Sequence, residues 1–156
     1  MSSDRIAIFG WGNPSRGDDA LAPLLLDRLQ GCDATRVTDF QLQIEHATDI
    51  VGHSLLLFMD AAQNTPAPFR FTRLSATRDR SYSSHSLSPE ALLSVYQDVY
   101  REPAPDAFLL AIAGYGFELG APLGEQAEKN LEQAIAFVQV LLRTPLAEFW
   151  DSRLTQ

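Results

Sequence analysis

The fold is decided by residues 6–19, whose sequence IAIFGWGNPSRGDD is typical of a strand, a glycine-rich turn and the start of a helix. Ile6 to Phe9 is a continuous apolar run, as expected of a strand that is covered on both faces in a parallel sheet. The turn begins like a dinucleotide-binding fingerprint, but Pro14-Ser15 replaces the remainder and no third glycine follows in its place. Asp18 and Asp19 then put two negative charges where a pyrophosphate would need the positive end of the helix dipole. We therefore expect that this turn does not bind a nucleotide. A P-loop is excluded as well, because no Gly-Lys-Ser/Thr follows.

The remainder of the chain alternates apolar runs with helical patterns. Apolar runs at residues 37–40, 55–59 and 108–113 predict further strands, and residues 69–72 alternate as an edge strand with one wet face does. Apolar residues at helical spacing predict helices within 21–29, 92–100 and 131–142, with a weakly patterned short helix at 45–51. Ser88 is the expected N-cap of the second helix, and Pro89 its first residue. The predicted fold class is α/β: a three-layer sandwich with a mostly parallel twisted sheet, one antiparallel edge strand and helices on both faces.

The composition fits one soluble domain. The chain has 156 residues, of which 46% are hydrophobic and 21% charged, which is enough to bury one core. We expect a single domain over residues 1–156, in which residues 145–156 form a peripheral tail. Twelve Lys and Arg against twenty Asp and Glu give a net charge of −8, which argues against binding to nucleic acid or to an anionic membrane. The apolar runs are too short to span a bilayer and the N-terminus shows no signal peptide, so we expect a cytoplasmic protein, monomeric rather than oligomeric.

Nucleophilic and thiol-based sites have little support. Cys32 is the only cysteine, which excludes an internal disulfide and a cysteine-rich metal site. It follows the first predicted helix at the end far from the carboxyl ends of the strands, so we interpret it as a small core or surface residue. No Gly-x-Ser-x-Gly elbow is present. His46 and His53 are weak candidates for chemistry, because one lies in the short predicted helix and the other directly precedes a strand.

Three titratable residues lie where ligands bind in a sheet of this kind, beyond the carboxyl ends of the strands. Asp19 opens the first helix, Asp60 ends the most apolar strand, and His85 lies in a polar loop before the second helix. Each alone has an ordinary interpretation: a helix cap beside Asp18, a hydrogen-bonded loop acid, and a surface histidine. Together they would supply two oxygen ligands and one imidazole and leave positions open for water or substrate. Such a set is compatible with zinc, nickel, manganese or iron.

Taken in order, these motifs resemble the maturation endopeptidases of nickel–iron hydrogenases. The resemblance runs from about residue 6 to residue 142. It rests on a Gly-x-Gly-Asn turn with an acidic pair, a strand ending in Asp-Ala, and a Ser-rich loop with a histidine before a helix, which are residues 10–19, 56–61 and 83–87. Residues 40–47 and 114–120 are similar to the branch that serves soluble, NAD-linked hydrogenases. One departure is Ala22, which replaces a common glycine on a helix turn, and we expect it to change packing rather than chemistry.

The resemblance implies a metal-dependent endopeptidase that removes a C-terminal extension from the large-subunit precursor of a hydrogenase. Nickel already installed in the precursor would be the recognition element, bound by Asp19, Asp60 and His85, while the resting protein is metal-free. Asp18 would be either the general base or the residue that fixes the loop, and Asn13 would orient a carbonyl group. Two alternatives stay open. One is a noncatalytic nickel-checkpoint or metallochaperone module for the same precursor; the other, weaker one is a flavodoxin-like nucleotide or flavin binder, which the acids at the helix start disfavour.

Overall fold

A five-stranded sheet forms the centre of the protein. The structure is a computed structural model that describes residues 5–29, 31–78 and 87–155. The strand order is β2-β1-β3-β5-β4, and all neighbours are parallel except β4, which pairs antiparallel with β5. The predicted sheet and its antiparallel edge strand are therefore confirmed. The strands are β1 (Ile6–Trp11), β2 (Thr35–Asp39), β3 (Leu55–Ala62), β4 (Phe69–Leu74) and β5 (Asp106–Ala113).

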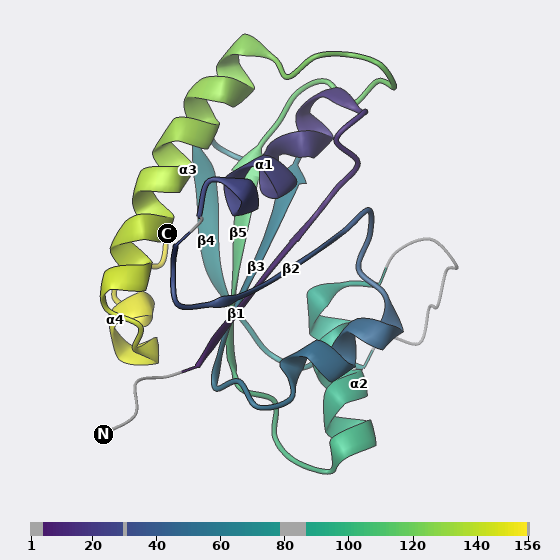
Figure 1. The fold of residues 1–156 in the computed structure, drawn as a ribbon, viewed down its shortest axis with the longest axis vertical. Coiled ribbons are helices and arrows are strands. Elements are labelled where there is room, and N and C mark those ends of the chain that lie inside the picture. The colour runs from purple at the N-terminus through teal and green to yellow at the C-terminus, as the bar shows by residue number, and fades with distance from the viewer. Residues whose placement is uncertain (1–4, 30, 79–86, 156) are drawn as a thin grey trace.

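Helices cover both faces of the sheet, which completes the three predicted layers. Figure 1 shows α1, α3 and α4 on one side of the sheet and α2 on the other. The Ser88 hydroxyl accepts a hydrogen bond from the backbone N–H of Ala91 at 3.1 Å, which confirms it as the N-cap that precedes Pro89. No helix among the described residues is both long enough and apolar enough to cross a membrane. The helices are η1 (Gly17–Ala20), α1 (Leu21–Asp27), η2 (Ile44–Ile50), α2 (Pro89–Tyr100), α3 (Glu125–Arg143) and α4 (Ala147–Asp151), of which η1 and η2 are 3₁₀ helices.

Alternation along the strands sends successive side chains into two separate cores. Ile6 and Ile8 pack with α1 and α3, whereas Phe9 packs with η2 and α2. In β3 the residues on the α2 face include Phe58, whose ring stacks on that of Phe9 with centroids 4.8 Å apart. Asp60 is the next residue of this row, so the alternation directs its carboxylate to the α2 face just beyond the apolar core.

The helix α1 packs closely on β1 at the position where the family resemblance departs from its pattern. Ala22 is fully buried, and a Cβ atom at Gly10 would lie 3.1 Å from the Ala22 carbonyl oxygen. A strand glycine therefore makes room for the backbone of the helix. Ala22 therefore lies in the packing between α1 and β1 and not among the acids of the turn.

The segment that we expected to be a peripheral tail packs into the fold instead. Its short helix α4 places Trp150 in the core with 0% exposure. The indole N–H donates to the carbonyls of Leu141 at 2.9 Å and Thr144 at 3.1 Å, and the backbone N–H of Thr155 donates to Phe71 of β4. The prediction failed because one tryptophan in a five-residue helix produces no periodic pattern that sequence reading could detect.

Replacing this tryptophan should strongly destabilise the protein. We expect Trp150→Ala to lower the free energy of unfolding by about 3–5 kcal/mol, because it removes a fully buried ring and leaves a cavity. Trp150→Phe keeps one six-membered ring but loses the rest of the indole and its hydrogen bonds, so it should cost less, about 1–2 kcal/mol. Urea unfolding followed by circular dichroism measures both values. Equal stability of Trp150→Ala and the parent would contradict the packing of α4.

Candidate active site

The turn between β1 and η1 carries Asp19 to the carboxyl ends of the strands. The Asp19 carboxylate accepts a hydrogen bond from the backbone N–H of Asn13 at 2.7 Å, which closes the turn on itself. Gly12 adopts a φ of 150°, and a Cβ atom there would lie 2.0 Å from the carbonyl oxygen of Asp19. Only glycine fits such an approach. The glycine at position 12 therefore allows the Gly-x-Gly-Asn turn to fold back onto Asp19.

Asp60 lies at the end of β3, close enough to Asp19 for the two carboxylates to interact. Burial and the neighbouring charge of Asp19 together raise the pKa of Asp60 from 3.8 to about 7. Hydrogen bonds from the backbone of Ala61 and the indole of Trp11 oppose this rise in pKa only partly. The structure thus brings together two of the three ligands predicted from the sequence. Their two negative charges repel each other, and partial burial strengthens this repulsion.

The third predicted ligand, His85, lies outside the described residues. The chain is described again from Leu87, and α2, which follows, covers the face of the sheet to which Asp60 belongs. Within residues 5–29, 31–78 and 87–155, no group of three His, Cys, Asp or Glu side chains is placed to hold a metal ion. The convergence of all three ligands therefore stays a prediction.

Asp18 anchors a distant loop rather than facing the carboxylate pair. It is 2% exposed, and its two carboxylate oxygens accept backbone N–H groups from Tyr115 at 2.7 Å, Gly116 at 3.1 Å and Gly124 at 2.8 Å. Its own N–H donates to the Gly116 carbonyl at 2.7 Å. These bonds hold the β5–α3 loop against the turn that presents Asp19. Of the two roles left open from the sequence, they favour the fixing of the loop.

A variant at Asp18 should reveal this anchoring role. Asp18→Asn has one acceptor oxygen in place of two and directs an NH₂ group at a backbone N–H, so we expect it to lower the free energy of unfolding by about 3 kcal/mol. Asp19→Asn is the matched control, because the neighbouring carboxylate accepts a single described backbone N–H. Urea unfolding of the two variants measures the difference. Equal losses would show that the negative charge at the helix start matters, and not the loop.

The side-chain oxygen of Asn13 stabilises the turn. Its Oδ1 atom accepts the backbone N–H of Ser15 at 2.9 Å, an Asx-type turn that its position before Pro14 favours. Within the described residues its Nδ2 group has no hydrogen-bond partner. The amide N–H groups are therefore available beside Asp19, as the predicted role of orienting a carbonyl group requires.

Sequence reasoning missed one carboxylate at this edge of the sheet. Asp39 ends β2 directly opposite Trp11 of β1, and its carboxylate lies 3.4 Å from Nε2 of the buried His46. The Nδ1 atom of His46 accepts the backbone N–H of Gln43 at 2.8 Å, so a neutral ring carries its proton on Nε2, toward Asp39. The rule that led to Asp60, a carboxylate at the end of a strand, applies equally here. It was obscured because β2 is an exposed edge strand with a weak apolar run.

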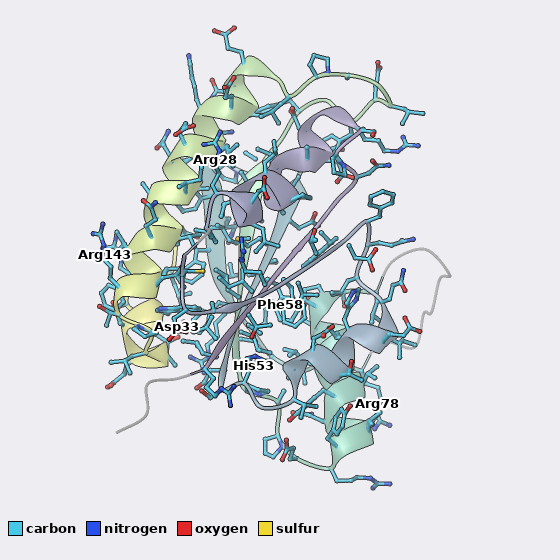
Figure 2. All side chains as sticks on the ribbon, viewed as in Figure 1. Arg28, Asp33, His53, Phe58, Arg78 and Arg143 are labelled. Carbon is cyan, nitrogen blue, oxygen red and sulfur yellow. The ribbon has the colours of Figure 1, made fainter. Side chains whose placement is uncertain are left out.

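Cys32 and His53, which were also considered from the sequence, lie at the opposite end of the sheet. Cys32 is half-buried and packs against the core that α1 and α3 share, as interpreted from the sequence. It lines a cavity of about 420 Å³ together with Arg28, Asp33 and Arg143, which Figure 2 labels on the side of α3. His53 precedes β3, and its Nε2 atom lies 2.9 Å from the Thr35 hydroxyl. These residues contribute nothing to the carboxylate pair.

The fold agrees with that of known processing enzymes, although no family model and no curated protein sequence matches the chain. It is similar to the [NiFe] hydrogenase maturation protease HycI from Thermococcus kodakarensis KOD1, with 21% identity, a TM-score of 0.69 and coverage of 92% of this chain and 95% of that one. It is also similar to the hydrogenase maturating endopeptidase HybD from E. coli, with 20% identity, a TM-score of 0.70 and coverage of 89% and 92%. A hydrogenase 2 maturation peptidase from a Thaumarchaeota archaeon matches at 19% identity and a TM-score of 0.64, with coverage of 90% and 99%. The fold of this protein is therefore the fold of the hydrogenase maturation proteases.

Proposed function

We propose that this protein is an endopeptidase that removes the C-terminal extension of a nickel–iron hydrogenase large-subunit precursor after nickel has been inserted. The observation that carries the proposal is the carboxylate pair of Asp19 and Asp60, held at the carboxyl edge of the sheet in a maturation-protease fold. In such a sheet this edge is where ligands bind. The pair is costly for the free protein, which is expected of a functional site and not of a purely structural one.

A divalent cation fits the chemistry of this pair. Two carboxylates that repel each other in a half-buried place are stabilised when a cation binds between them. Their oxygens and the imidazole of His85 form a donor set that nickel accepts. In this proposal the ion belongs to the precursor and arrives with it as part of the substrate. When bound, it supplies the polarisation of a carbonyl group or of a water molecule.

The side chains of the chain itself have separate tasks. Asp19 and Asp60 hold the precursor in place through its metal, and Asn13 directs its amide N–H groups at a carbonyl oxygen of the peptide. The Asp60 carboxyl, whose pKa lies at about 7, must release its proton when it becomes a ligand, so binding of the precursor is coupled to pH. Asp18 keeps the turn and the β5–α3 loop in register, which fixes the position of Asp19.

Cleavage of purified precursor tests the proposal. The protein is incubated with nickel-loaded and with nickel-free large-subunit precursor, and the released extension is measured by mass spectrometry. We expect cleavage of the nickel-loaded precursor alone. Cleavage of both forms would remove nickel as the recognition element. Binding to the nickel-loaded precursor without cleavage would instead favour the noncatalytic checkpoint or metallochaperone module.

A further inference from the structure

The strand β2 leaves one edge of the sheet open. Among the described residues, β2 pairs only with β1, and four of its five residues are exposed. The Asp39 carbonyl accepts the backbone N–H of Gly12 at 3.0 Å, so the backbone polar groups of Asp39 point to β1. In a parallel ladder alternate residues point the same way, and the N–H and C=O groups of Arg36 and Thr38 therefore point outward. These are the groups to which an added strand would pair.

A cleft of about 930 Å³ runs beside this open edge. Its lining comes from three residues of β2, from α1 and from the turn after β1. It extends along the strand from Ala34 to Phe40 and reaches the turn at Gly12 and Pro14. An extended peptide that pairs with an exposed strand edge can place alternate side chains in an adjoining pocket. The remaining lining residues are Pro23, Leu24, Leu26, Asp27, Arg36, Thr38 and Asp39.

The cleft reaches the turn that presents Asp19, although its α1 residues place it on the face of the sheet opposite to that of Asp60. Gly12 lines the cleft and also contacts the backbone of Asp19. Trp11 is the ladder partner of Asp39 in β2, and on its other side it neighbours the end of β3. Because neighbouring strands are about 4.8 Å apart, Asp39 and Asp60 are separated by about 10 Å across the sheet edge, a span of about three extended residues.

We propose that the extension of the precursor, in the residues that directly follow the scissile bond, binds along β2 as an additional strand of the sheet. This inference rests on the proposed function. The body of the precursor must lie over the carboxylate pair with its nickel, whereas the extension is a chain end and is the part able to lie along the open edge of β2. A second copy of this chain is a poorer occupant, because it would bring another net charge of −8 and a second Asp27 and Asp39 to the same cleft.

Strand addition has a signature of period two that a proline scan of the precursor detects. Single prolines are placed at successive positions of the extension after the scissile bond, and cleavage of each nickel-loaded precursor is measured. Prolines that remove an N–H directed at β2 should raise KM about tenfold or more, and those between them should change it little, with kcat unaffected in both sets. The scan leaves the protease unaltered, and each tolerated position is the matched control for the next. A uniform effect along the extension would overturn the proposal.

A variant of the edge strand tests the other side of the same contact. Thr38→Pro removes an outward N–H that β2 does not need for its own ladder, so the fold should tolerate it while KM rises about tenfold. Thr38→Val lacks the same hydroxyl but keeps the N–H, so its KM must rise less than that of Thr38→Pro. An equal rise in KM in the two variants would show that the threonine side chain is responsible, and it would overturn strand addition. Loss of a dimer in Thr38→Pro, seen by size exclusion, would assign the edge to a second copy and overturn it as well.

Hydrogen exchange separates this inference from the proposed function, because it needs no turnover. A synthetic peptide spanning the scissile bond and the start of the extension is added to the parent protein, and amide exchange is followed by NMR. Exchange of the Arg36 and Thr38 amides should slow about tenfold or more. Protection without any cleavage of precursor would refute the protease while keeping the strand site. Cleavage of precursor with both amides unprotected, or no binding of the peptide, would refute the strand site alone.

Discussion

Asp60→Asn is expected to lower kcat/KM for cleavage of the nickel-loaded precursor by roughly 10³-fold. Asparagine keeps the shape of the side chain and one oxygen ligand, but it removes one of the two negative charges that face the cation. The remaining carboxylate of Asp19 then holds the precursor's metal with about half of the electrostatic attraction. Asp19→Asn should have an effect of similar size, because the two carboxylates act on the same ion.

The control for this prediction is an acid of the same type at the other end of the molecule. Asp33 is exposed beside the cavity that Arg28 and Arg143 line, and Asp33→Asn should cleave the precursor at the parental rate (Figure 2). Rates are measured by mass spectrometry under conditions in which less than half of the precursor is consumed. Parental activity of Asp60→Asn would remove Asp60 from the site, even though the fold would be unchanged.

The positions of Asp19 and Asp60 were predictable because parallel sheets collect their strand ends at one edge. Apolar runs marked β1 and β3 in the sequence, and the residues after them had to lie near each other. The separation of the two carboxylates and the raised pKa of Asp60 were not predictable. They depend on how the turn at Gly12 folds back, and on which of two adjacent acids points toward β3.

Asp18 and Asp39 show what a single sequence hides. Both are carboxylates beside the predicted turn or strand ends, yet one binds backbone N–H groups from about a hundred residues away and the other faces a histidine of η2. The partners of Asp18 are so distant along the chain that they leave no local pattern, whereas His46, the partner of Asp39, is close in sequence but lies in a short helix with a weak pattern. The same reason explains Trp150, whose place in the core depends on the path of the chain after α3 and not on any repeat within α4.

The second large effect is on stability. Asp60→Asn should be more stable than the parent, and the difference in the free energy of unfolding should grow as the pH rises. In the unfolded chain Asp60 ionises near its ordinary pKa of 3.8, whereas the folded protein holds the proton up to a pKa of about 7. Between these two values the folded state binds more protons than the unfolded state, so the free energy of unfolding falls as pH increases through the window. Three pKa units correspond to about 4 kcal/mol, lost by about pH 8. Asparagine cannot ionise and is spared this loss.

Urea unfolding between about pH 4 and pH 8, with a chelator present to exclude metal ions, measures this prediction. The stability difference between Asp60→Asn and the parent should be small at the acidic end and grow to about 4 kcal/mol at the alkaline end. Asp60→Ala is the matched variant: the lost side chain shifts its whole curve by a constant amount, but the slope against pH must be the same as for asparagine. A difference that does not vary with pH would show that Asp60 is not the group that holds the proton. A variant that is inactive toward the precursor yet more stable at neutral pH would show that the carboxylate pair is retained for its chemistry, at the expense of the free protein.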